Sequence, residues 1–175
     1  MRVTIAIPAY QGERFIRAAV DSALSQVLMA DDGLPELYEV LVRDDGSTDG
    51  TLKALEDIQD TRLRIVAGDH CGAIAKSFQA TLDLITTPFF VICGQDDLMD
   101  TNYLSRTMAE MKDGVAMVGC QPRFINADGS PYINPADPRL AIPKAFNMSR
   151  EQWQALFKIG NIYFGINTYL RTAVI

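Results

Sequence analysis

The 175-residue chain has few of the residues that build cross-linked, zinc-binding or membrane-spanning folds. Its three cysteines, Cys71, Cys93 and Cys120, are odd in number and far apart, and no Cys-x-x-Cys pair occurs. Together with a single histidine, His70, they cannot complete a usual zinc set, so we expect reduced structural thiols in a cytoplasmic protein. The longest wholly apolar runs are far too short to cross a bilayer, and the N-terminus enters an apolar strand at once, so no signal peptide is expected.

Basic residues are also in the minority. The 16 Lys and Arg residues are outnumbered by 22 Asp and Glu residues, which gives a net charge of −6. Because sequence-independent nucleic-acid binders carry a basic face, this balance argues against that class. A hydrophobic content of 48% and a charged content of 22% are typical of a soluble globular protein, and the length suits a single domain.

Short apolar runs alternate with helical periodicities over most of the chain. Strands are predicted for Val3–Ile7, Tyr38–Val42, Leu63–Val66, Phe89–Cys93 and Val115–Val118. Amphipathic helices are predicted for residues 15–27, 52–58, 74–85 and 104–111. This βαβ alternation predicts an α/β fold, with a Rossmann-like, mostly parallel sheet covered by helices on both faces.

The pattern changes after Cys120. A small antiparallel hairpin is predicted where Arg123–Asn126 and Tyr132–Asn134 flank an Asp-Gly pair. Residues 134–148 contain three prolines and suggest a long surface loop, and a capping box at Ser149–Gln152 predicts a short helix through Phe157. The chain ends in an apolar run, from which we expect a fragment of a longer protein.

Acidic clusters follow two of the predicted strands. Asp44–Asp49 comes after the run that ends at Val42, and Gln95–Asp97 comes after the run that ends at Cys93. In an open α/β sheet, ligands bind in the crevice beyond the carboxyl ends of the strands. An acidic rim would repel a bare phosphate, but Mg²⁺ and similar ions take oxygen ligands from a carboxylate or two and from substrate phosphates. The two clusters therefore predict a metal-assisted site for a nucleotide diphosphate compound.

Other enzymes that use such acids fit less well. A haloacid-dehalogenase phosphatase needs a nucleophilic Asp after the first strand, where Pro8–Tyr10 is found instead. A nucleotidyltransferase needs a Gly-rich basic loop there, and Gln11–Arg14 is neither. The Gly-x-Gly-x-x-Gly fingerprint of Rossmann dehydrogenases is absent from the same place.

Four segments together resemble the family 2 glycosyltransferases, which have the GT-A fold. Val3–Gly12 is similar to the opening strand and loop of that family, and Glu39–Thr51 to its second strand and D-D-G-S-T-D-G-T turn. Gly72–Phe78 resembles the family's third-helix entry, and Gly94–Asp97 occupies the place of its D-x-D-D motif. The resemblance runs over nearly the whole chain.

The resemblance implies six residues that bind a nucleotide sugar. Asp45 would accept a hydrogen bond from the imide N–H of uracil or thymine, Tyr10 would pack on the base, and Pro8 would lend its backbone. Ser77 would lie near the donor phosphates, and Gln95 would reach the ribose or the sugar. Plainer readings remain open for two of these: Asp45 as a turn or helix cap, and Tyr10 as a core aromatic. The sixth residue is Asp96.

Asp96 would match the metal-binding carboxylate of the family and hold Mn²⁺ or Mg²⁺. The sequence departs from the family at Gly94, where the first Asp of D-x-D is usual, so one acidic ligand is missing. Asp97 would either support the metal or cap the following helix.

The activity implied is inverting, metal-dependent transfer of a sugar from a UDP- or dTDP-sugar to the hydroxyl of a glycan or lipid-linked acceptor, as in synthesis of bacterial surface polysaccharide by rhamnosyltransferase-like members. Residues 1–120 would form the nucleotide-sugar half and residues 121–175 the start of the acceptor half of one domain. The catalytic base would lie beyond Ile175, so none is named. A cytoplasmic protein is expected, peripheral to the inner face of the membrane through parts outside these residues. The alternative is a degenerate or truncated domain that binds nucleotide sugar without turnover.

Overall fold

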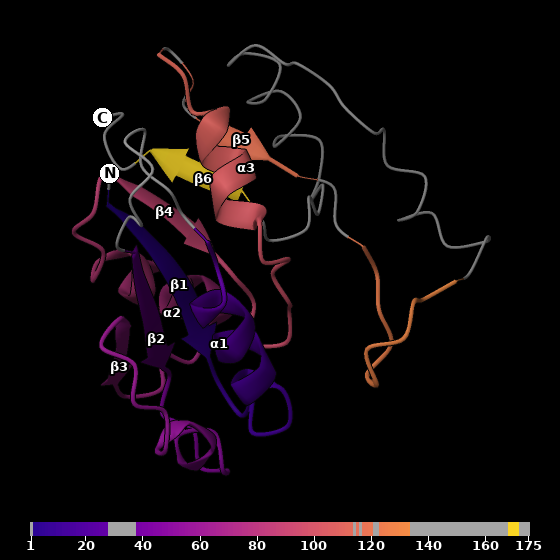
Figure 1. The fold of residues 1–175 in the computed structure, drawn as a ribbon. Coiled ribbons are helices and arrows are strands. Elements are labelled where there is room, and N and C mark those ends of the chain that lie inside the picture. Colours follow the sequence, from indigo (N-terminus) through magenta and orange to yellow (C-terminus); the bar gives the residue numbers. More distant parts are fainter. Residues whose placement is uncertain are drawn as a thin grey trace, which may run out of the picture.

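A six-stranded sheet organises the fold (Figure 1). The computed structural model describes residues 2–27, 38–113, 115, 117–120, 123–133 and 168–171. The strands are β1 (Val3–Ala9), β2 (Tyr38–Asp44), β3 (Leu63–Ala67), β4 (Phe89–Ile92), β5 (Met117–Gly119) and β6 (Thr168–Arg171). They lie in the order β3-β2-β1-β4-β6-β5. The first four pair in parallel, and β6 pairs antiparallel with both β4 and β5.

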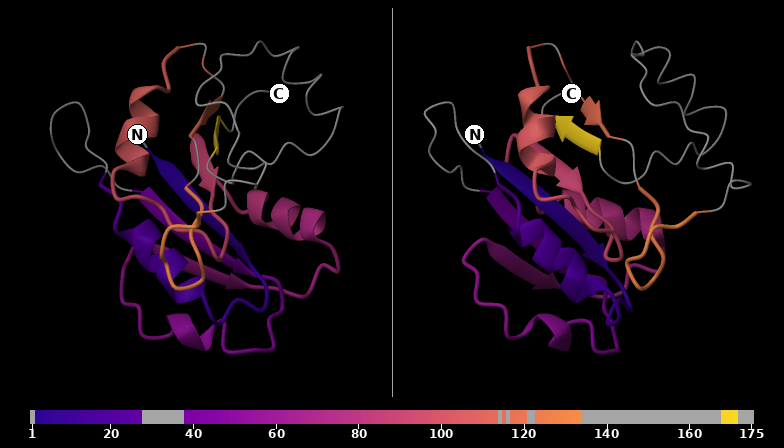
Figure 2. Two further views of the ribbon diagram at one scale, coloured as in Figure 1. Left: turned by 90° about the vertical axis from the view of Figure 1, so that its right-hand side faces the viewer. Right: turned by 45° about the vertical axis from the view of Figure 1, so that its right-hand side comes forward.

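Helices cover both faces of this sheet (Figure 2). The elements α1 (Ile16–Leu24) and α3 (Tyr103–Ala109) lie on one face, and α2 (Ile74–Leu82) lies on the other. This arrangement confirms the predicted α/β fold with a mostly parallel sheet. None of the helices in the described part of the chain is long and apolar enough to cross a membrane.

The central strand β1 is apolar because both of its faces are covered. Val3, Ile5, Ala6 and Ile7 have no exposed surface, and parallel strands buried on both sides are expected to read as continuous apolar runs. The register pairs Ala9 with Asp44, so β1 and β2 end side by side. The loops that follow these two strands therefore start from the same edge of the sheet.

The predicted helix at residues 52–58 is wrong. This segment forms only the 3₁₀ turn η1 (Lys53–Leu55), and three of its backbone amides bond to carbonyls three residues earlier, as from Ile58 to Leu55 at 3.1 Å. Leu55 is the one fully buried side chain of this turn. A single fully buried side chain does not provide the apolar stripe that stabilises an α-helix, so this segment forms only a short 3₁₀ turn.

The later part of the chain differs from the prediction in two places. The expected fifth strand is shifted to Met117–Gly119, and β6, which was not predicted, lies between it and β4. The expected hairpin has the turn, with Gly129 at a φ of 82°, but only the single bridge Ile125–Pro131 in place of a ladder. The loop at 134–148 and the helix through Phe157 lie outside the described residues.

Candidate functional site

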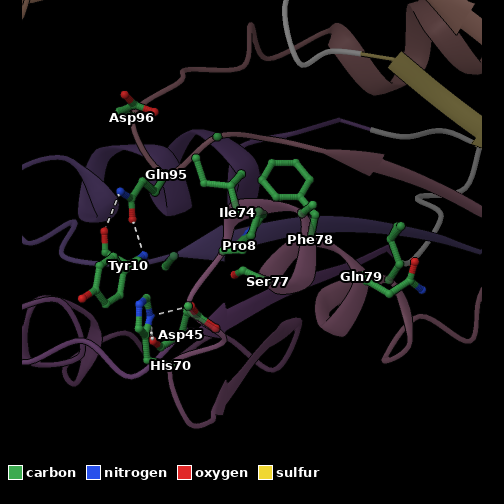
Figure 3. A pocket seen from close by; sticks show the side chains of 16 residues that line it. Pro8, Tyr10, Asp45, His70, Ile74, Ser77, Phe78, Gln79, Gln95 and Asp96 are labelled. Carbon is green, nitrogen blue, oxygen red and sulfur yellow. Dashed lines mark hydrogen bonds and ion pairs between the residues drawn. The ribbon is translucent and has the colours of Figure 1, made fainter.

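An open cavity of about 1220 Å³ lies beyond the carboxyl ends of β1, β2 and β4 (Figure 3). Its walls come from the end of β1, the loop after β2, the loop before α2 with one face of α2 itself, and the loop after β4. Its lining includes all six residues predicted to bind a nucleotide sugar: Pro8, Tyr10, Asp45, Ser77, Gln95 and Asp96. The structure thus brings them together in the crevice expected for an α/β sheet, while the role of each stays a prediction.

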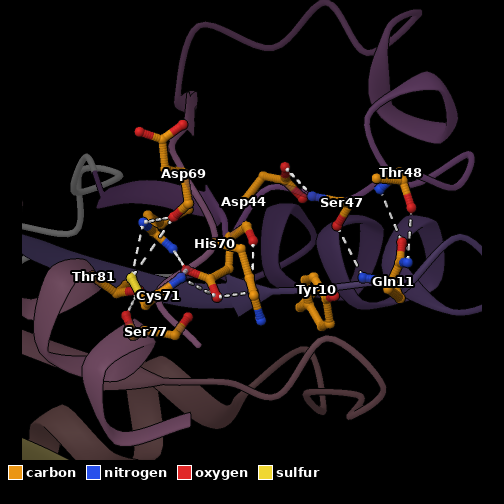
Figure 4. A network of polar contacts seen from close by, with 12 residues as sticks. Tyr10, Gln11, Asp44, Ser47, Thr48, Asp69, His70, Cys71, Ser77 and Thr81 are labelled. Atoms are coloured by element: carbon orange, nitrogen blue, oxygen red, sulfur yellow. Dashed lines mark hydrogen bonds and ion pairs between the residues drawn. The ribbon is translucent and has the colours of Figure 1, made fainter. Parts of the chain in front are cut away.

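Asp45 is the most deeply buried acid of the cavity, with a side chain only 3% exposed. Its Oδ1 forms an ion pair with the Arg43 guanidinium, which is itself 8% exposed. The Cys71 backbone N–H points at both carboxylate oxygens, at 3.2 and 3.1 Å, and His70 Nδ1 lies 2.9 Å from Oδ2 (Figure 4). Every partner of this carboxylate is therefore a donor.

These donors decide the charge of Asp45. Burial alone would raise the pKa of the carboxyl group, because a low dielectric disfavours the charged form. Hydrogen bonds from Cys71 and from Arg43, together with the Arg43 charge, outweigh burial and lower the pKa to about 2. Asp45 is therefore ionised at neutral pH and acts only as a hydrogen-bond acceptor.

Tyr10 stands at the mouth of the cavity with 42% of its surface exposed. The Gln95 side chain fixes its backbone, because Oε1 accepts from the Tyr10 N–H at 2.8 Å and Nε2 donates to the Tyr10 carbonyl at 3.0 Å. The imidazole of His70 stacks on the Tyr10 ring, with centroids 4.3 Å apart and an angle of 19° between the planes. Tyr10 thus presents an aromatic face into the cavity and is not a core residue.

The loop after β1 is joined to the loop after β2 by a row of hydrogen bonds (Figure 4). The Gln11 N–H donates to Ser47 Oγ at 2.9 Å, and the Gln11 side chain bonds to the hydroxyl and the backbone N–H of Thr48. The Gly12 N–H donates to Thr51 Oγ1 at 2.8 Å. These bonds hold Tyr10 and Asp45 in a fixed relation to each other.

One face of α2 forms a wall of the cavity. Ile74, Phe78 and Leu82 line it, and Ile74 is 80% exposed, whereas the buried residues of the helix are Ser77 and Thr81. The apolar periodicity that predicted this helix therefore marks a ligand-facing surface and not the core. The buried side of the helix is formed by two small hydroxyl residues, Ser77 and Thr81.

The described residues contain no cluster of three or more metal-binding side chains. Asp96 is exposed at the cavity rim, whereas Asp97 is half-buried and its pKa is raised, first by burial and then by the charge of Asp96. A Cβ at Gly94 would meet Asp97 Oδ2 at 2.7 Å, so the Asp97 carboxylate fills the space of the missing side chain. One exposed carboxylate fits Mg²⁺ or Mn²⁺ only if substrate phosphates and water complete the coordination.

Sequence reasoning missed two residues of this site. Arg43 lies two positions before Asp45, and alternate residues of an extended chain share a face, so this pair was readable from the spacing. His70 carried no such signal, because its partners Tyr10 and Asp45 lie on other loops. Lys76, on the same helix as Ser77, is exposed and does not line the cavity.

The sequence model described as "Glycosyl transferase family 2" matches residues 4–174. The chain belongs to this family. A chondroitin synthase of Pasteurella multocida (strain Pm70) is 31% identical over 136 residues, which is 75% of this chain and 13% of that protein. An Escherichia coli protein named UDP-Glc:alpha-D-GlcNAc-diphosphoundecaprenol beta-1,3-glucosyltransferase WfaP is 28% identical over 126 residues, covering 72% of this chain and 47% of its own length.

A solved structure of similar fold is the mannosyltransferase PcManGT from Pyrobaculum calidifontis in complex with GDP-Man and Mn²⁺. It superposes with a TM-score of 0.60 at 27% identity, over 70% of this chain and 36% of its own. The GT-A fold implied by the sequence is thereby confirmed. The chain spans less than half the length of the two relatives above.

Proposed function

We propose that this chain forms the donor-binding part of a glycosyltransferase that uses a UDP- or dTDP-sugar. The observation that carries the proposal is the ionised Asp45 carboxylate, buried beside the exposed Tyr10 ring at the carboxyl edge of the sheet. A flat base with an imide N–H can stack on Tyr10 and donate to this carboxylate. The name of the E. coli relative, which includes UDP-Glc, is in keeping with such a donor.

The cavity also suits the rest of the donor. The side chains of Ile74 and Phe78 offer apolar surface, and the buried Ser77 faces the space between them and Asp45 (Figure 3). Asp96 lies at the rim, where a diphosphate would bring its oxygens towards a shared cation. When bound, Mn²⁺ or Mg²⁺ would offset the charge that develops on the departing diphosphate.

Two finer features belong to the same proposal. The transfer would invert the anomeric carbon, and the acceptor would be the hydroxyl of a growing or lipid-linked glycan at the inner face of the membrane. The name of the E. coli relative includes a diphosphoundecaprenol-linked acceptor. We assign no residue as the catalytic base.

Binding without turnover is the second candidate. It is favoured by Gly94, which replaces an acid, and by the Asp97 carboxylate that fills its place. A donor-hydrolysis assay separates the two functions: release of sugar from a UDP-sugar supports the enzyme, and tight binding with no release over hours supports the binder.

Calorimetry with UDP, dTDP, ADP and GDP, with and without Mn²⁺, tests the proposed donor. A hydrogen bond to a charged group contributes about 1.5–3 kcal/mol, so we expect UDP and dTDP to bind roughly ten- to a hundredfold more tightly than ADP and GDP. Asp45→Asn should lose this preference, and the exposed Asp57→Asn should keep it. Equal binding of all four nucleotides would contradict the proposal.

A further inference from the structure

His70 makes the two contacts that the proposed site offers to a base. Its ring stacks on the Tyr10 ring, with the centroids 4.3 Å apart and an angle of 19° between the planes (Figure 3). Its Nδ1 lies 2.9 Å from Asp45 Oδ2. Because the ionised carboxylate can only accept, the proton of this hydrogen bond is on Nδ1. The imidazole is thus a flat ring with an N–H directed at Asp45, as a pyrimidine imide would be.

The other contacts of the Asp45 carboxylate come from Arg43 and Cys71. Arg43 holds Oδ1 from the buried side, and the Cys71 backbone N–H lies between the two oxygens. Arg43 is 8% exposed, whereas the His70 side chain is 47% exposed. Among the side chains that bond to this carboxylate, which are those of Arg43, Cys71 and His70, the imidazole is the most exposed, so it can leave by a side-chain rotation into solvent.

The backbone of this segment is held in place, whereas the imidazole itself is 47% exposed. A Cβ at Gly46, which has a φ of 75°, would come within 2.9 Å of the His70 backbone nitrogen. The turn after Asp45 and the loop before α2 are thus in direct contact, and only glycine permits it at this φ. His70 therefore starts beside Asp45 in any rotamer.

We propose that the His70 imidazole occupies the nucleobase position in the free protein and has to leave it when a base binds. This inference rests on the proposed function, since it takes Tyr10 and Asp45 as the base site. A base can then bind only to the fraction of molecules in which the imidazole has left this position. The apparent dissociation constant for the base is the intrinsic constant divided by that fraction. His70 is a specificity-determining residue in this arrangement.

The exchange selects ligands that carry a base. A pyrimidine restores both contacts that the imidazole gives up, one on Tyr10 and one on Asp45. A pyrophosphate or a sugar phosphate restores neither, so it binds with the imidazole still in place. Removal of the imidazole should therefore strengthen the binding of UDP and leave the binding of pyrophosphate unchanged.

The test uses His70→Ala, with Asp69→Asn at the exposed neighbouring position as the matched control. By calorimetry we expect His70→Ala to bind UDP about tenfold more tightly than the unchanged protein, and the control to match the unchanged protein. Equal or weaker UDP binding by His70→Ala, while the unchanged protein binds UDP, overturns the inference and leaves the proposed function intact. Failure of both proteins to bind UDP overturns the proposed function, and the inference with it.

Proton NMR of the unchanged protein gives a second readout, which does not depend on the variant. The chain has one histidine, so its imidazole C–H signals are unambiguous. Stacking on Tyr10 places them in the ring current of the tyrosine, and UDP should return them to the positions of an exposed histidine. Signals that keep their ring-current shift at saturating UDP would overturn the inference.

Discussion

The Gln95 side-chain amide bonds both backbone polar atoms of Tyr10, accepting from its N–H at 2.8 Å and donating to its carbonyl at 3.0 Å. The two residues are 85 positions apart in sequence. A residue of the loop after β4 therefore sets the position of the aromatic ring that follows β1. This contact gives Gln95 a task distinct from the sugar contact that the sequence suggested.

Gln95→Ala should weaken UDP binding without removing any direct contact to the base. Loss of two hydrogen bonds at about 0.5–1.5 kcal/mol each frees the Tyr10 backbone, so we expect roughly a tenfold loss of affinity by calorimetry. Gln59→Ala, at an exposed position that does not line the cavity, is the control and should bind UDP normally. An unaltered affinity in Gln95→Ala would mean that Tyr10 is positioned by other contacts.

Gly12→Ala should act through the same contact. A Cβ at Gly12 would overlap Gln95 Oε1 and lie 2.8 Å from Cδ, so the amide has to move away from Tyr10. We expect Gly12→Ala to lower UDP affinity about as much as Gln95→Ala, and the double variant to be no worse than either single one. Additive losses in this double-mutant cycle would show that Gly12 acts independently of Gln95.

Asp96→Asn should abolish the gain in UDP affinity that Mn²⁺ provides. Asp96 is the only acid at the cavity rim that matches the family's metal position, and a neutral amide is a poor ligand for a hard cation. Calorimetry with and without Mn²⁺ measures the difference, and Asp97→Asn, whose carboxyl group is half-buried, serves as the comparison. An undiminished Mn²⁺ effect in Asp96→Asn would refute the metal assignment.

Asp45 should make folding stability depend on pH in the acid range. Its pKa falls from 3.8 to about 2 on folding, so it contributes about 2 kcal/mol that is fully present above pH 4 and is lost as the pH falls towards 2. Urea unfolding of the protein and of Asp45→Asn at several pH values isolates this contribution. The gap between the two curves should close as the pH approaches 2, and a constant gap would contradict the assigned pKa.

Local sequence determined much of this fold. The apolar runs of β1, β2 and β4 are continuous because both faces of a parallel sheet are buried, and this pattern is readable without any knowledge of the partner strands. The same runs place Asp45 and Gln95–Asp96 at strand ends, which is why their place beside one cavity at this edge of the sheet was predictable. Arg43 was readable too, since alternate residues of a strand share a face.

Tertiary structure decided the rest. The place of β6 between β4 and β5 depends on pairing across a long stretch of chain, which no local pattern encodes. The helical spacing of Ile74, Phe78 and Leu82 says that they share a face, but only the packing of α2 through Ser77 and Thr81 turns that face towards the cavity. The stack of His70 on Tyr10 likewise exists because two separate loops meet beyond the sheet, where side chains from distant positions contact each other and no periodicity relates them.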